Sequence, residues 1–411
     1  MIMKKKYLKF FIFIIWIVLT STFVSEIGLL AFLDRLPLRL SIHLTGPKRI
    51  LSQYTKDGVY PKNYICLVGD SYAYGYGPWL YENAGSWGHP SYATQHILRK
   101  NLQRDIVSFG YPGYGNFGSS VTALAELEFL GNSYLRKVES PKHLLYFFYE
   151  GNDLVNNVIG LDRKGINIHD RNSSITSKEI RELIASEANK VKSALNILDL
   201  SIISNLVKGL TKDLKLRYFP ENQQPTTGIS NLNHAKTKKP KKNDLLDVKS
   251  SQNIINISGV DHLFSYADGP GLLLTDYERH LGLLTLKESL GFLKNHLKET
   301  EITVVFIPSA LSIYKFSSEK ITPAHSVLSN SNENQFKSFC PKDAWDLCEM
   351  NRNSVLEITK SLKLKYLDPV SEFRKIAEVN LLHDSEDRLH FNRKGYEVFG
   401  NFLSKEFKKN L

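Results

Sequence analysis

The sequence predicts an α/β fold of three layers, in which helices cover both faces of a central parallel sheet. Short apolar runs rich in β-branched and aromatic residues each end in a polar or glycine-containing turn. Stretches with helical periodicity separate these runs, which is the pattern of repeated βαβ units. A chain of 411 residues has ample length for one large domain of this kind with an insertion.

Four apolar runs are predicted to be strands, and they cover residues 64–67, 106–109, 144–149 and 302–307. The turns that follow them are Val-Gly-Asp-Ser at 68–71, Gly-Tyr-Pro-Gly-Tyr-Gly at 110–115, Glu-Gly-Asn-Asp at 150–153 and Pro-Ser at 308–309. Helices are predicted over 121–130 and 272–299. Because ligands of parallel sheets bind at the carboxyl ends of the strands, we expect these turns to form the functional site.

The turns and the C-terminal segment supply the residue types of a nucleophilic triad. Ser71 follows the first strand, where an α/β sheet exposes a nucleophile. His390 is the candidate base, and Asp387, three residues earlier, would face the same way and orient the imidazole. The backbone N–H groups of Ser71 and Gly113, with the side-chain amide of Asn152, are candidates for an oxyanion hole, in which each donor contributes about 3–4 kcal/mol.

In this order, Ser71, Gly113, Asn152 and His390 resemble the four motif blocks of the SGNH (GDSL-type) hydrolase superfamily. The resemblance covers about residues 60–160 and 300–408. It implies a flavodoxin-like sheet, ester hydrolysis by a serine nucleophile, and a triad completed by Asp387.

One departure from the family pattern is Glu150, which stands where the third block usually begins with glycine. Asn152 remains, so the departure affects the expected substrate class more than the expected catalysis. Membrane-anchored members from bacterial polysaccharide pathways are similar in plan. The resemblance therefore implies an acylated glycan as substrate and polysaccharide-assembly proteins as partners.

The function expected from these residues is hydrolysis of an O-acyl ester, foremost an O-acetyl ester, on a cell-surface or exported glycan. An O-acyltransferase that passes the acyl group to a sugar hydroxyl would use the same triad, and a non-catalytic scaffold for polysaccharide assembly would keep only the fold. Each motif also has a purely structural reading: residues 69–71 as a strand-ending turn, Asn152 as a helix cap and His390 as a surface histidine.

No cofactor and no metal are predicted. The glycine-rich loop lacks the Gly-Lys-Ser/Thr ending of a phosphate-binding loop. The chain has 12 histidines, but no His-Glu-x-x-His pattern and no cysteine pair with zinc-finger spacing.

The N-terminal segment predicts a membrane anchor over residues 1–40. Three lysines at 4–6 precede an apolar stretch from 7 to 33, which is long enough to span a bilayer. A cleaved signal peptide is the alternative, although the stretch exceeds a typical h-region and no Ala-x-Ala site follows it. We therefore expect a single-pass protein of a bacterial inner membrane with a periplasmic catalytic domain, and no nucleic acid among its partners.

The cysteines bear on the same compartment. Cys340 and Cys348 flank a short polar stretch, whereas Cys66 lies within the first predicted strand. A Cys340–Cys348 disulfide would fit an oxidising compartment, and two unpaired thiols are the alternative.

The predicted organisation is an anchor at 1–40, a hydrolase domain at 60–160 and 270–411, and an insertion at 161–269. The insertion begins with a helical stretch at 177–216 and continues as a polar loop at 221–251 that carries a basic cluster at 236–242. The net charge is +11. The cluster is interpreted either as a solvated loop or as a site for anionic lipid or acidic polysaccharide.

Aromatic residues crowd the predicted site loops. Many are expected to pack in the core, and the tyrosines on glycine loops are candidates to line a sugar-binding groove. The set is Tyr72, Tyr74, Tyr76, Trp79, Tyr81, Trp87, Tyr111, Tyr114 and Phe117.

Overall fold

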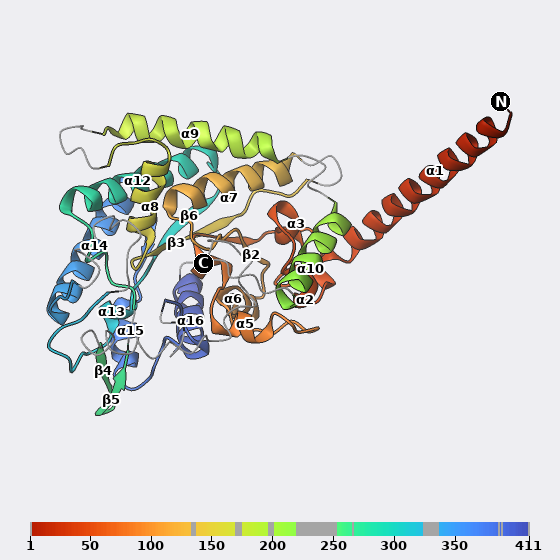
Figure 1. Cartoon of the computed structure of the whole chain (residues 1–411). Coiled ribbons are helices and arrows are strands. Elements are labelled where there is room, and N and C mark those ends of the chain that lie inside the picture. The colour runs from red at the N-terminus through yellow and green to blue at the C-terminus, as the bar shows by residue number, and fades with distance from the viewer. Residues whose placement is uncertain are drawn as a thin grey trace.

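The computed structural model describes residues 2–132, 137–168, 175–195, 201–218, 253–264, 267–323, 337–384, 387 and 389–409. Its central sheet confirms the predicted fold class (Figure 1). Five strands pair in parallel in the order β2–β1–β3–β6–β7. They are β1 (Ile65–Val68), β2 (Ile106–Ser108), β3 (His143–Tyr149), β6 (Glu301–Ile307) and β7 (Lys365–Leu367).

Alternate strand residues face two separate apolar clusters, as a sheet covered on both faces requires. Cys66 and Val68 of β1 pack into one cluster, whereas Ile65 and Leu67 pack into the other. The first cluster lies under α7 (Asn116–Gly131), α8 (Asp153–Arg163), α9 (Ser177–Ala194) and α12 (Asp276–His296). The second lies under α6 (Thr94–Leu102), α15 (Val370–Ala377) and α16 (Arg393–Lys409).

The fifth strand, β7, was not predicted from the sequence. It lies at the edge of the sheet, and its three residues are half-buried or exposed. An edge strand of this length carries no continuous apolar run, so its sequence lacks the signal that marks β1, β3 and β6.

The predicted helices are present with shifted ends. The stretch 121–130 lies inside α7, and 272–299 contains α12. Helix α12 begins where it does because Thr275 accepts a hydrogen bond from the backbone N–H of Glu278, whose carboxylate accepts one from the Thr275 N–H.

The helical stretch predicted at 177–216 corresponds to two helices, α9 and α10 (Ile202–Tyr218). Helix α9 packs on α7 and α12, so it belongs to the layer that covers the sheet. The polar loop predicted at 221–251, with its basic cluster at 236–242, lies outside the described residues.

The next described segment forms an antiparallel hairpin of β4 (Ile254–Ile257) and β5 (Val260–Leu263). The segment that follows the hairpin is fixed beyond the end of β6. The Leu311 N–H of α13 (Ala310–Ile313) donates to the Asp268 carbonyl at 3.1 Å, and Ala267 pairs with Pro323. This segment therefore reaches the carboxyl edge of the sheet.

The N-terminal helix α1 (Ile2–Ala31) projects away from the domain (Figure 1). Its segment Phe10–Ala31 has a mean hydropathy of 2.1, so it is long and apolar enough to cross a membrane. Near its end, the Glu26 carboxylate accepts hydrogen bonds from Ser201 Oγ at 2.6 Å and from the N–H groups of Ile202 and Ile203 at 2.8 and 3.0 Å. Glu26 thus caps α10, and this contact joins the apolar helix to the domain.

The disulfide considered for Cys340 and Cys348 is absent, and both thiols are free. Cys340 is the N-cap of α14 (Pro341–Ser361), and Cys348 lies within that helix. Eight positions along a helix correspond to about 12 Å. Because a disulfide requires Cα atoms within about 7 Å, the helix keeps the two thiols apart.

Candidate active site

The turn after β1 presents Ser71 at the carboxyl edge of the sheet. Gly69 has φ +155°, and a Cβ there would lie 2.9 Å from the Cβ of Phe147 on the neighbouring strand, so the turn needs glycine at this position. Asp70 caps the short helix α4 (Ser71–Tyr74) by accepting from the Tyr72 N–H at 2.9 Å. Ser71 is the first residue of that helix.

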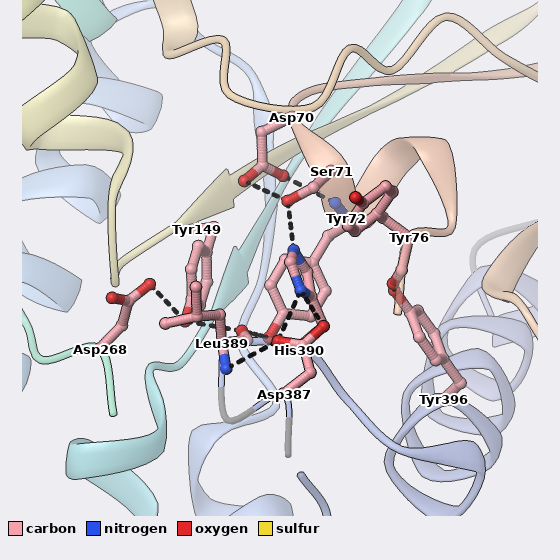
Figure 2. Close-up of polar contacts among 10 residues, drawn as sticks. All are labelled: Asp70, Ser71, Tyr72, Tyr76, Tyr149, Asp268, Asp387, Leu389, His390 and Tyr396. Atoms are coloured by element: carbon pink, nitrogen blue, oxygen red, sulfur yellow. Dashed lines mark hydrogen bonds and ion pairs between the residues drawn. The ribbon is translucent and has the colours of Figure 1, made fainter. Parts of the chain in front are cut away.

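The structure brings Ser71, His390 and Asp387 together, as Figure 2 shows. His390 Nε2 lies 2.9 Å from Ser71 Oγ. His390 Nδ1 lies 2.8 and 3.1 Å from the two carboxylate oxygens of Asp387. The Leu389 N–H donates to the same carboxylate at 3.2 Å, which fixes its orientation.

Carboxylates dominate the electrostatics of His390. Burial lowers the pKa of its imidazole, but the charges of Asp387, Asp70 and Asp268 and the hydrogen bond from Nδ1 to Asp387 outweigh this effect and raise the pKa above its usual 6.5. Burial opposes ionisation of Asp387 as well, yet His390 holds its pKa below the usual 3.8. The pair is therefore built to stabilise an imidazolium beside Ser71.

Asp70 contacts both Ser71 and Asn152. Its Oδ2 accepts from Ser71 Oγ at 3.2 Å, and its carboxylate also accepts a hydrogen bond from the side-chain amide of Asn152. Asn152 is the N-cap of α8, and this bond ties its side chain to the residue that precedes Ser71. Burial raises the pKa of Asp70.

The next residue, Asp153, is fully buried and ties the third turn to its surroundings. Its Oδ2 accepts from Asn116 Nδ2 and from the Tyr149 N–H, both at 2.9 Å. Burial, followed by the charge of Asp70, raises the pKa of Asp153 well above its usual value. Asp153 thus supports the position of Asn152 rather than facing the nucleophile.

The structure places Gly113 in a loop that packs against the nucleophile turn. The Tyr111 N–H donates to the Gly69 carbonyl at 3.1 Å, and a Cβ on Gly110 would lie 2.2 Å from the Tyr74 nitrogen. Gly113 has φ +79°, and no atom lies within 4 Å of the position its Cβ would take. Gly113 is therefore exposed, and its positive φ favours glycine.

A buried arginine braces this loop. Arg49, on α3 (Gly46–Leu51), places its guanidinium 4.5 Å from the ring centroid of Tyr111 and 5.4 Å from that of Tyr74. Glu126 of α7 lies 4.0 Å from Arg49 and accepts from the Tyr111 hydroxyl. The sequence analysis missed this cluster, because nothing local to residue 49 or 126 signals the contact.

The aromatic residues of the site loops divide into two groups. Tyr72, Trp79 and Phe117 are buried in the core. Tyr74, Tyr76 and Tyr111 are half-buried, and Tyr114 and Trp87 are exposed. The ring of Tyr76 lies 5.1 Å from that of His390, and Tyr114 stacks on Tyr111 at 5.3 Å. The side chain of Tyr81 lies outside the described residues.

Glu150 makes hydrogen bonds with the segment after β6. Its Oε2 accepts from the N–H and the hydroxyl of Ser309, at 2.9 and 3.0 Å, and from the hydroxyl of Ser312. The side chain is fully buried, and burial raises its pKa. The residue that replaces the expected glycine therefore joins the end of β3 to the segment after β6.

Two further residues of the site were missed by the sequence analysis. The Tyr149 hydroxyl lies 3.3 Å from Asp268 Oδ2 and 3.1 Å from the Leu389 carbonyl (Figure 2). Asp268 comes from the segment after the β4–β5 hairpin, far from every motif in the sequence, so no local signal marks it. Tyr149 was read only as the end of an apolar strand.

Within the part of the chain that the structure describes, no three His, Cys, Asp or Glu side chains are grouped so that they could hold a metal ion.

No family model matches the chain, and no curated protein matches it. Among solved structures, the lipase/acylhydrolase from Enterococcus faecalis aligns over 85% of this chain and 96% of its own, with 12% sequence identity and a TM-score of 0.31. A second crystal structure aligns over 85% of this chain and 98% of its own, with 10% identity and a TM-score of 0.34.

Proposed function

We propose that the chain is a serine esterase of the SGNH type that hydrolyses an O-acyl ester, in particular an O-acetyl ester on a glycan. The observation that carries the proposal is the continuous path Ser71 Oγ–His390 Nε2 at 2.9 Å and His390 Nδ1–Asp387 Oδ2 at 2.8 Å. A nucleophile, a base and an orienting carboxylate in this arrangement are what serine-based acyl transfer requires.

In the proposed mechanism, Ser71 Oγ attacks the acyl carbon while its proton passes to His390 Nε2. The imidazolium, stabilised by Asp387, then gives this proton to the oxygen of the leaving alcohol. Water attacks the acyl-enzyme with His390 again as the base, and the carboxylic acid leaves with Ser71 restored. The N–H groups of Ser71 and Gly113 and the amide of Asn152 would donate to the oxyanion.

The experiment uses the full chain in detergent micelles with p-nitrophenyl acetate as substrate. We expect Ser71→Ala to lower kcat/KM by at least about 10³-fold, since the remaining donors preserve only part of the catalysis. Ser91→Ala, at an exposed serine, is the matched control. A fluorophosphonate should add one mass adduct to the wild type and none to Ser71→Ala. Folded wild-type protein with neither turnover nor adduct would contradict the proposal.

The half-buried and exposed tyrosines on the loops after β1 and β2, of which Tyr76 lies 5.1 Å from the His390 ring, support a glycan as the alcohol part of the substrate. We expect Ala substitution at Tyr74, Tyr76 and Tyr114 to weaken binding of an acetylated glycan, measured by calorimetry with the Ser71→Ala protein. Unchanged affinity would remove the glycan from the proposal. Product analysis with a sugar acceptor separates the outcomes: acylated sugar in excess of free acid would indicate a transferase.

An uncleaved anchor is the proposed role of α1. The Glu26 contacts with α10 support it, because cleavage after the apolar stretch would remove the cap of that helix. The exposed Cys340 provides a test of sidedness, since Cys66 and Cys348 are buried. A membrane-impermeant maleimide should label spheroplasts that carry the wild type but not those with Cys340→Ser. Labelling only after membrane lysis would place the domain in the cytoplasm.

A further inference from the structure

Asp268 is a carboxylate at the candidate active site that the mechanism above does not use. It lies on the chain between β5 and α12, and three contacts fix this segment beyond the end of β6 and against the middle of α14. They are the Leu311 N–H to the Asp268 carbonyl at 3.1 Å, the pairing of Ala267 with Pro323, and Asn351 Nδ2 to the Pro270 carbonyl at 3.0 Å. The side chain therefore has a defined position beside the triad.

The contacts of Asp268 lead to the base through Tyr149. The Tyr149 hydroxyl has one hydrogen, and the acceptors in its reach include Asp268 Oδ2 at 3.3 Å and the Leu389 carbonyl at 3.1 Å. The Tyr72 hydroxyl donates to the same carbonyl at 2.8 Å. Since Leu389 directly precedes His390, these bonds hold the backbone that carries the imidazole.

The charge of Asp268 is not neutralised by a cation. Its second oxygen has no hydrogen-bond partner in the described part of the chain, and no described Lys or Arg forms an ion pair with it. The residue is half-buried. A negative charge in such a position favours the positive form of a neighbouring titratable group, and His390 is such a neighbour.

We propose that Asp268 is a positioning residue for His390: its carboxylate stabilises the imidazolium that forms as Ser71 loses its proton, and through Tyr149 it orders the Leu389 carbonyl. The inference rests on the proposed esterase mechanism for its catalytic meaning. It also gives the segment after the hairpin a role, because that segment delivers a second carboxylate to the base.

The state of Asp268 changes the hydrogen bonds around it. An ionised Asp268 accepts from Tyr149, whereas a protonated one can donate to the Tyr149 oxygen and direct the tyrosine hydrogen to Leu389. Burial raises the pKa of Asp268 to about 7, with Asp387 and Asp70 adding to the effect and His390 and Tyr149 opposing it. The change between these two hydrogen-bond arrangements is therefore expected near neutral pH.

Other titratable groups also face His390, and they enter the interpretation of its pH dependence. Asp387 and Asp70 carry negative charge toward it, and burial lowers the pKa of His383 to about 3, so that this neighbour is neutral at neutral pH. Burial raises the pKa values of the surrounding Tyr72, Tyr149 and Tyr396, so they are neutral as well. The ring of Tyr76 also lies 5.1 Å from that of His390.

The test is the pH profile of kcat/KM for the full chain in micelles. Because the neutral imidazole is the active form, activity rises with pH through the pKa of His390. Asp268→Asn should move this rise to lower pH by about 0.3–1 unit, less than the one to three units of a directly paired carboxylate. It should also lower the plateau about two- to fivefold, because the base becomes weaker.

Three further variants separate a positioning role from a structural one. Asp268→Glu keeps the charge and should return the profile toward that of the wild type. Tyr149→Phe should lower the plateau while leaving the midpoint within about 0.2 unit. Asp261→Asn, which removes a carboxylate on the exposed hairpin, is the matched control. An Asp268→Asn profile with a lower plateau and an unmoved midpoint would overturn the proposal.

A second measurement does not depend on esterase activity. The titration of His390, followed by NMR of the full chain with ¹³C-labelled histidine and assigned with His390→Gln, should show a lower pKa in Asp268→Asn than in the wild type. An unchanged titration overturns the inference. If the wild type lacks activity but the titration shifts as expected, the esterase proposal fails while the coupling between Asp268 and His390 stands.

Discussion

The contact between His390 and Asp387 makes Asp387→Asn the sharpest test of the candidate triad. The carboxylate lies 2.8 and 3.1 Å from Nδ1, so it fixes the tautomer that leaves Nε2 free to accept from Ser71. An amide in its place has no charge and can donate as well as accept, so it no longer dictates that tautomer.

The expected loss in kcat/KM follows from the burial of the His390–Asp387 pair. The exposed fractions of the two side chains are 11% for His390 and 21% for Asp387, so solvent screens the interaction only partly. Removing one partner of such a pair costs about 3–5 kcal/mol. If this loss falls on the transition state, where the imidazolium forms, each 1.36 kcal/mol is a factor of ten, and kcat/KM should fall about 10²–10⁴-fold.

The assay is p-nitrophenyl acetate hydrolysis over pH 5–10, with Asp346→Asn on the exposed face of α14 as the control. Asp387→Asn should also move the rise in activity to lower pH, because it removes the strongest of the charges that raise the pKa of His390. A loss below tenfold at pH 8, with the midpoint unchanged, would refute the assignment of Asp387 as the residue that orients the base.

Asp387→Asn should also lower the stability of the protein by an amount that depends on pH. The folded-state pKa of His390 is raised and that of Asp387 is lowered, so the pair contributes stability above the unfolded pKa of the aspartate and below the folded pKa of the histidine. The difference in Tm between the wild type and Asp387→Asn should therefore be larger at pH 5–6 than at pH 9. A difference that grows toward pH 9 would contradict this reasoning.

Three other features give direct expectations. Glu26→Gln should lower the free energy of unfolding by about 1–2 kcal/mol, because the α10 cap loses its charge; a thermal shift no larger than that of Glu82→Gln would contradict the cap. Reductant should leave the intact mass unchanged, because Cys340 and Cys348 are free; a gain of about two mass units would reveal a bridge. Burial raises the pKa of Glu150, so its ionisation costs stability as pH rises. The Tm of Glu150→Gln relative to that of the wild type should therefore rise from pH 5 to pH 8. A Tm difference independent of pH would show that Glu150 does not titrate in this range.

The sequence predicted those parts of the fold whose signal is local. The strands β1, β3 and β6 are buried on both faces and appear as continuous apolar runs, and a turn that contains polar residues follows each. The strand β7 and the β4–β5 hairpin were missed because exposed positions interrupt their apolar pattern. Their existence depends on pairing with partners far away in the chain, which periodicity does not report.

The residues of the candidate site divide in the same way, into those in local motifs and those that distant segments bring in. Ser71, Asn152 and His390 stand in short motifs that can be read from the sequence, and the structure brings Ser71 and His390 into contact. Arg49 comes from α3, and Asp268 comes from the chain before α12. Both therefore become visible only in the folded chain. For the cysteines, nearness in sequence left a disulfide and two free thiols as alternatives, and the continuous helix α14 favours the free thiols.

The tripeptide Gly69-Asp70-Ser71 shows how a local motif encodes more than its nucleophile. Gly69 lets the turn pass close to Phe147, Asp70 caps α4 and also holds the amide of Asn152, and Ser71 then lies between Asp70 Oδ2 at 3.2 Å and His390 Nε2 at 2.9 Å. His390, unlike Asp70, is hydrogen-bonded to a carboxylate, that of Asp387, which would stabilise the transferred proton. The aspartate of the motif therefore contacts the candidate oxyanion donor and shapes the turn, while the distant segment at 387–390 carries the candidate base.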